Sequence, residues 1–193
     1  MNTLRSISRL LCFLIAAVAM VAGLASTTAG SEATPQQLFF ANLKSLCGAT
    51  YVGVTEFPLN EPDHPLGGGK QLTIHFASCS ETEIRIPLQA GEDKSRTWVL
   101  TLRDGKLLLK HDHRHPDGTP DKQTNYGGWA TDGGTAQRQQ FAADEETAKL
   151  IPEAATNVWT IEIDAVRQRF GYSLERNKAP RYRAAFKLQP SLQ

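Results

Sequence analysis

Apolar and polar residues alternate with a period of two along most of the chain beyond residue 50. Trp159, Ile161 and Ile163, for example, are separated by Thr160 and Glu162. This alternation is typical of antiparallel strands with one face in the core and the other in water. Alternating segments occupy residues 51–57, 72–76, 84–88, 97–102, 107–109, 159–164, 170–175 and 181–188, and 137–141 is one more. The pattern predicts about eight or nine strands, in an all-β domain that is either a single antiparallel β-barrel or a sandwich.

Helical signals stand before the first strand. Thr34 is a good N-cap, Pro35 suits the first helical position, and Gln37 completes a capping box. Apolar residues then recur at helical spacing until Gly48, a natural C-terminal stop. We therefore expect an N-terminal α-helix over residues 34–47. A short second helix is expected over 143–151.

The first 25 residues differ from the rest of the chain. Arg5 and Arg9 precede an apolar run of about 15 residues, Leu10 to Leu24, which is shorter than the roughly 20 residues that span a bilayer. Small residues follow it, as at the cleavage site of a secretory signal peptide. We expect a signal peptide over 1–25 (alternative end at 29), a short linker over 26–33, and one β domain over 34–190. The expected location is secreted or periplasmic, with no membrane span after cleavage.

Loss of this segment changes the charge and the cysteine inventory. Removing Arg5 and Arg9 takes the formal net charge from +1 to −1, so bulk charge argues against a nucleic-acid binder. Cys12 also leaves, and Cys47 and Cys79 remain. Because exported proteins meet an oxidising compartment, we predict a Cys47–Cys79 disulfide. The alternative is two buried thiols.

The strongest local signal is Asp104-Gly105 between two alternating runs, which favours a two-residue hairpin turn. The resulting register places Trp98 opposite His111 and Arg96 opposite His113. The apolar faces of the two runs then match, which supports this register. Three histidines therefore share the inner face at one end of the domain: His111, His113 and His115.

These histidines allow three interpretations. Imidazoles at alternate strand positions can converge on a divalent metal such as zinc, with Asp117 as a further ligand. Other candidate oxygen or nitrogen donors are His64, Asp121 and Asp132. Arg96 opposite His113 argues against a cation. The second interpretation is structural, with histidines at a polar rim. The third is a pocket for an anion or polar ligand, built from Arg96, Trp98 and the histidines.

About 20 residues after the histidines lack clear periodicity and are rich in turn residues, so they predict a long loop. Tyr126 and Trp129 in this loop could cover the histidine end as ligand-binding residues, or simply anchor the loop. Farther on, basic residues become dense, and we expect them to form a solvated hairpin face rather than an anion-binding patch. They are Arg167, Arg169, Arg176, Lys178, Arg181, Arg183 and Lys187.

Several sequence segments resemble those of a family of small uncharacterised secreted bacterial proteins, over roughly residues 38–188. They are Glu83-Ile-Arg-Ile-Pro-Leu, Gly91-Glu-Asp-Lys-Ser-Arg-Thr-Trp-Val-Leu-Thr, Leu109-Lys-His-Asp-His-Arg-His and Asn125-Tyr-Gly-Gly. That resemblance implies no activity, ligand or catalytic residue. Size, strand number and initial helix also resemble lipocalin-like (calycin) barrels at the level of fold. The lipocalin Gly-x-Trp signature is absent where this chain reads Thr50-Tyr51-Val52-Gly53.

The leading functional hypothesis is a non-catalytic binding module. Its small ligand would be polar, anionic or metal-linked, and would sit at the end that carries the three histidines. One alternative is a metal-dependent hydrolase or lyase that uses the same histidines with Asp117 or Asp121. A second alternative is a protein-interaction domain of the cell envelope. No catalytic residue is assigned.

Overall fold

The computed structural model describes residues 32–58, 66–67 and 69–189. The predicted signal peptide and His64 lie outside these residues. The helices are α1 (Pro35–Lys44), α2 (Glu145–Leu150) and the single-turn η1 (Pro152–Ala154). Thr34 caps α1 in the predicted capping box with Gln37, and Asp144 caps α2. In the described part of the chain, no helix has the length and apolar character needed to cross a membrane.

The described residues form one 11-stranded sheet, antiparallel at every pairing, in the order β7-β6-β5-β4-β2-β1-β11-β10-β9-β8, with β3 beside β4. The strands are β1 (Thr50–Phe57), β2 (Leu72–His75), β3 (Ser78–Cys79), β4 (Glu83–Ala90), β5 (Asp93–Arg103), β6 (Lys106–His113), β7 (Tyr126–Trp129), β8 (Arg138–Ala142), β9 (Asn157–Asp164), β10 (Arg169–Arg176) and β11 (Ala179–Lys187). The predicted all-β class with an N-terminal helix is confirmed.

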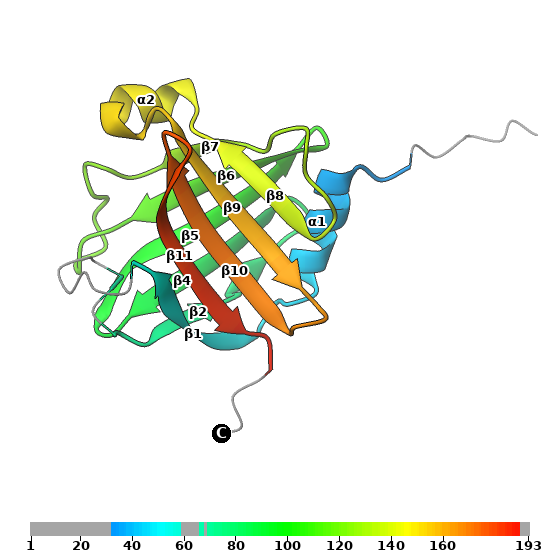
Figure 1. Ribbon diagram of the computed structural model, residues 1–193, viewed down its shortest axis with the longest axis horizontal. Helices are drawn as coiled ribbons and strands as arrows, with labels where there is room; N and C mark the ends of the chain where they lie inside the picture. The colour runs from blue at the N-terminus through cyan, green and yellow to red at the C-terminus, as the bar shows by residue number, and fades with distance from the viewer. Residues whose placement is uncertain (1–31, 59–65, 68, 190–193) are drawn as a thin grey trace, which may run out of the picture. The chain divides into compact units, whose positions relative to one another are not determined.

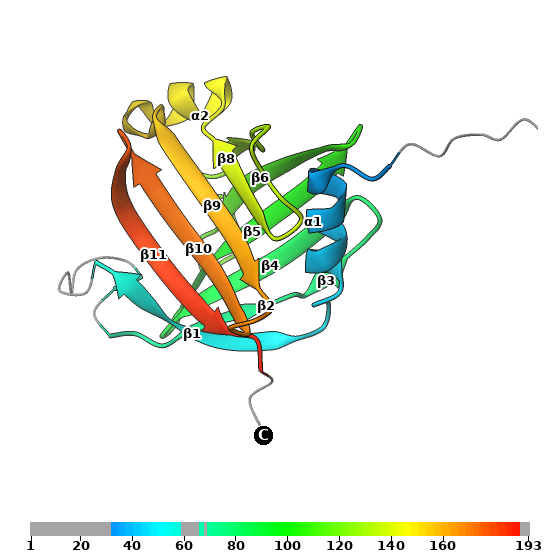
Figure 2. The ribbon, with the colours of Figure 1, turned by 45° about the vertical axis from the view of Figure 1, so that its right-hand side comes forward.

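The two end strands of the sheet, β7 and β8, approach each other and nearly close it into a barrel. Ala130 and Phe141 form a β-bridge, and the Thr131 amide donates to the Gln140 carbonyl at 2.8 Å. Figures 1 and 2 show β9, β10 and β11 crossing β4 and β5. The buried core combines side chains of both groups of strands, such as Ile86, Ile161 and Phe170. The architecture is therefore a barrel rather than two separate sheets.

Glycine makes this closure possible. A Cβ on Gly128 would stand 1.7 Å from the Ala142 carbonyl oxygen, and one on Gly127 would stand 1.9 Å from the Leu109 carbonyl oxygen. The expectation of a continuous long loop is therefore wrong at this point, because β7 pairs with β6 through Gly127 and Gly128. The alternation that marks other strands is missing here, since close backbone approach excludes side chains.

The Asp-Gly hairpin between β5 and β6 has the predicted register. Trp98 pairs with His111 and Arg96 pairs with His113. Asp104 and Gly105 both have positive φ, at 51° and 75°. A two-residue turn of this kind matches the twist of the flanking strands, and so fixes which side chains face the interior.

Helix α1 covers the end of the barrel that carries this hairpin turn. Its Phe39 and Leu43 are fully buried in the core. The Gln36 side chain accepts a hydrogen bond from the Leu107 amide at 2.7 Å. The predicted Cys47–Cys79 disulfide is present and joins the segment after α1 to β3. This end of the barrel is consequently filled by apolar side chains and tied covalently.

We expect Gly128→Ala to lower the free energy of unfolding by about 2–4 kcal/mol, because its Cβ would overlap backbone that cannot move independently. Gly133→Ala is the matched control, since a Cβ there meets nothing within 4 Å. Its effect should stay within about 0.5 kcal/mol. Urea unfolding of both variants measures the difference, and equal midpoints would contradict the tight closure.

We expect reduction of the disulfide to lower the free energy of unfolding by about 3–4 kcal/mol, because a loop with a sequence separation of 32 residues is released in the unfolded chain. Urea unfolding with and without reductant measures it. The Cys47→Ala/Cys79→Ala double variant should show no effect of reductant, and any effect there would trace to something other than this bridge.

Candidate functional site

A cavity of about 410 Å³ lies at the opposite end of the barrel from α1, where β5 begins and β6 ends. We call it the barrel-end cavity. Five of the residues predicted to bind a ligand line it together: Arg96, Trp98, His111, His113 and Tyr126. Ile151 and Ala154, from the segment that follows α2, complete one side. The predicted inward histidine face therefore becomes the wall of a real cavity at two of its three positions.

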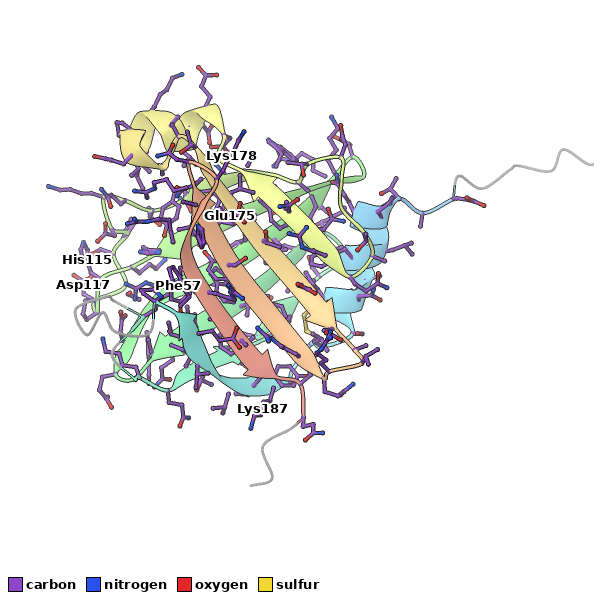
Figure 3. All side chains as sticks on the ribbon, viewed as in Figure 1. Phe57, His115, Asp117, Glu175, Lys178 and Lys187 are labelled. Carbon is purple, nitrogen blue, oxygen red and sulfur yellow. A yellow bond between two sulfur atoms is a disulfide. The ribbon has the colours of Figure 1, made fainter. Side chains whose placement is uncertain are left out.

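The other predicted residues lie elsewhere. His115 and Asp117 are exposed in the turn after β6, and Figure 3 shows them at the edge of the molecule, outside the sheet. The strand ends at His113, so the alternation that would turn His115 inward does not continue. Trp129 is 38% exposed and does not line the cavity. It lies three positions after Tyr126 on β7, so its side chain is on the opposite face of the strand. Asp121 lines the cavity, whereas Asp132 lies near the start of α1.

His111 is held as a neutral imidazole of defined tautomer. Its Nδ1 lies 3.1 Å from the Tyr126 carbonyl oxygen, which can only accept, so Nδ1 carries the proton. Its Nε2 then accepts from the Tyr172 hydroxyl at 2.8 Å. Burial lowers the pKa of His111 from 6.5 to about 3. Both ring nitrogens are therefore engaged by the protein, and the ring is uncharged at neutral pH.

His113 and Tyr126 form a second pair nearer the cavity mouth. The Tyr126 hydroxyl and His113 Nε2 are 3.0 Å apart. Burial, and then the charge of Arg96, lower the pKa of His113 below its ordinary value. Burial raises the pKa of Tyr126 to about 12. The pair therefore presents neutral hydrogen-bonding groups at neutral pH rather than fixed charges.

In the described part of the cavity wall, the charged side chains are those of Arg96, Arg176 and Asp121. Arg96 forms an ion pair with Asp93. Burial of Asp93 raises its pKa, but hydrogen bonds from Ser95 and Arg96 outweigh that effect and lower it to about 2. Arg176 is different: its Nε donates to the neutral Asn157 side chain at 2.8 Å.

Sequence reasoning missed the part of this wall that the last three strands form. β9, β10 and β11 contribute Asn157, Trp159, Tyr172, Arg176 and Tyr182. Arg176 does not belong to the expected solvated face. It lies on the same inward-facing side of β10 as Phe170, Tyr172 and Leu174. Extending that alternation by one more position would have found it. The pairing of Arg176 with Asn157 across β10 and β9 would have required the register of the sheet.

The geometry does not support the metal-site hypothesis with a set of ligands. Within the described residues, no group of three or more histidine, cysteine, aspartate or glutamate side chains is arranged to hold a metal ion. His111 and His113 lie in the cavity wall, whereas His115 and Asp117 lie outside it.

Comparison with known proteins adds no family or relative, since no family model matches the chain and no curated protein matches it. The functional argument consequently depends on the geometry of the barrel-end cavity.

We expect the protein to lose stability on acidification between pH 6.5 and about 3, with His111 as one source. The unfolded chain protonates this imidazole near pH 6.5 while the folded chain keeps it neutral to about pH 3, so the unfolded state binds more protons in that window. The slope is ~1.4 kcal/mol per pH unit for each such histidine.

His111→Gln removes this titration while keeping a donor and an acceptor. Urea unfolding at a series of pH values should therefore give a shallower acid slope for the variant than for the unaltered chain. Parallel slopes would show that His111 is not held neutral in the folded state.

Proposed function

We propose that this chain is an exported, non-catalytic binding protein that holds a small anion in the barrel-end cavity. The apolar N-terminal segment supports export, and the Cys47–Cys79 disulfide is consistent with an oxidising compartment. Concave sites of a few hundred Å³ with a few placed polar groups are typical of small-molecule binding.

The proposal rests mainly on the environment of Arg176. Its guanidinium lines the cavity, and among the described residues no carboxylate forms an ion pair with it. A guanidinium that is withdrawn partly from water and not neutralised by the protein favours an anion, which it can hold through two parallel hydrogen bonds. Asn157 holds Nε, which leaves the terminal nitrogens for the ligand.

The remaining polar groups support binding rather than chemistry. Both nitrogens of His111 are used within the protein, so this ring has no free position for proton transfer. In the Tyr126–His113 pair one group donates to the other, and the proton that remains can be donated to an anion without bringing a second negative charge. Among the described residues that line the cavity, Asp121 is the one acidic side chain, and its charge disfavours a highly charged anion.

The test compares benzoate with benzamide, which has the same size and no charge. We expect benzoate to raise the melting temperature and benzamide to bind at least about tenfold more weakly, ~1.4 kcal/mol. Arg176→Gln should weaken benzoate by a similar factor and leave benzamide unchanged. Isothermal titration or ligand-observed NMR gives the dissociation constants.

Arg181→Gln is the matched control, since Arg181 is exposed on β11 and does not line the cavity. It removes the same charge without altering the site. Equal affinity for benzoate and benzamide, or equal loss in the two arginine variants, would reject specific anion binding at Arg176.

A further inference from the structure

Beneath the charged mouth, the barrel-end cavity has a floor made of rings. Trp98 and Tyr172 stack with centroids 4.3 Å apart and planes at 21°. The His111 ring lies 5.1 Å from the Trp159 ring and 4.7 Å from the Tyr126 ring. We call Trp98, His111, Trp159 and Tyr172 the aromatic floor.

The polar side-chain atoms of Tyr172 and His111 in the aromatic floor are already paired with each other or with backbone. The Tyr172 hydroxyl donates to His111 Nε2, and His111 Nδ1 donates to the Tyr126 carbonyl. A ligand oxygen placed here would lose its water without gaining a comparable partner, at a cost of a few kcal/mol. The floor therefore favours an apolar group.

The mouth has the opposite preference. Arg176 stands two inward-facing positions beyond Tyr172 on β10, and Arg96 stands one inward-facing position beyond Trp98 on β5. Both guanidiniums are consequently on the mouth side of the rings. A ligand that matches both the aromatic floor and the mouth has an apolar end at the floor and an anionic end at the mouth.

We propose that the ligand class is a planar aromatic carboxylate that enters ring first, with its carboxylate at Arg176. This deepens the proposed function and rests on it. Flat indole, phenol and imidazole surfaces favour an aromatic ring over an aliphatic chain, through stacked or edge-to-face contacts. A volume of 410 Å³ is consistent with a ligand of one or two rings.

The test holds charge constant and varies the apolar end. Acetate, cyclohexanecarboxylate, benzoate and naphthoate each carry one carboxylate. We expect affinity to rise in that order, with benzoate at least about threefold tighter than cyclohexanecarboxylate and at least about thirtyfold tighter than acetate.

Tryptophan fluorescence reports where the ring goes. The chain has 3 tryptophans, of which Trp98 and Trp159 line the cavity and Trp129 does not. In the Trp129→Phe variant, naphthoate should change the emission of the two cavity tryptophans, and acetate should not. Trp159→Leu should weaken naphthoate by about tenfold or more, whereas Trp129→Leu, on the outer face, should leave it unchanged.

The outcomes separate the two proposals. If acetate binds as tightly as naphthoate and no emission changes, ring insertion is overturned and anion binding stands. If neutral naphthamide binds as tightly as naphthoate, anion binding is overturned while the aromatic floor keeps its role. If no ligand binds, both are overturned. The ligand series on the unaltered chain decides these outcomes even if Trp159→Leu fails to fold.

Discussion

The contact on which the site depends is the close backbone approach between β7 and its neighbours at Gly127 and Gly128. Thr147, at the start of α2, fixes this approach, because its hydroxyl accepts from the Gly127 amide and donates to the Gly127 carbonyl. Strand β7 begins with Tyr126, whose carbonyl sets the tautomer of His111 and whose hydroxyl is hydrogen-bonded to His113. Two residues without side chains thus control the polar groups of a cavity that they do not themselves line.

Sequence patterns predicted the parts of the fold that depend on neighbouring residues. The Asp104-Gly105 turn fixed the register of β5 and β6, and so placed Arg96, Trp98, His111 and His113 correctly on one face. The helix was also a local inference, whereas the disulfide was inferred from the two cysteines that remain after the expected signal peptide and from the expected oxidising compartment. β7 escaped detection because its glycines remove the very alternation by which strands are recognised.

The rest of the site could not be predicted in the same way, because it depends on contacts between distant strands. Tyr172 reaches His111 across 61 positions in the chain, and no pattern within either strand indicates that pairing. His115 and Asp117 are the converse case, because they were predicted to belong to the site and lie outside it. A periodicity extended past the true end of β6 placed His115 inside, where the backbone had already left the sheet.

The barrel is secured by different means at its two ends. A covalent bond and buried apolar helix residues hold the end at α1, whereas hydrogen bonds from Thr147 to backbone hold the cavity end. Hydrogen bonds of this kind open at a lower free energy than a disulfide-linked core. We therefore expect local opening to be easier at β7 and α2, beside the cavity, than at the α1 end. The two ends of one barrel thus differ in what an opening event must break: a covalent bond and a packed core at one end, and hydrogen bonds alone at the other.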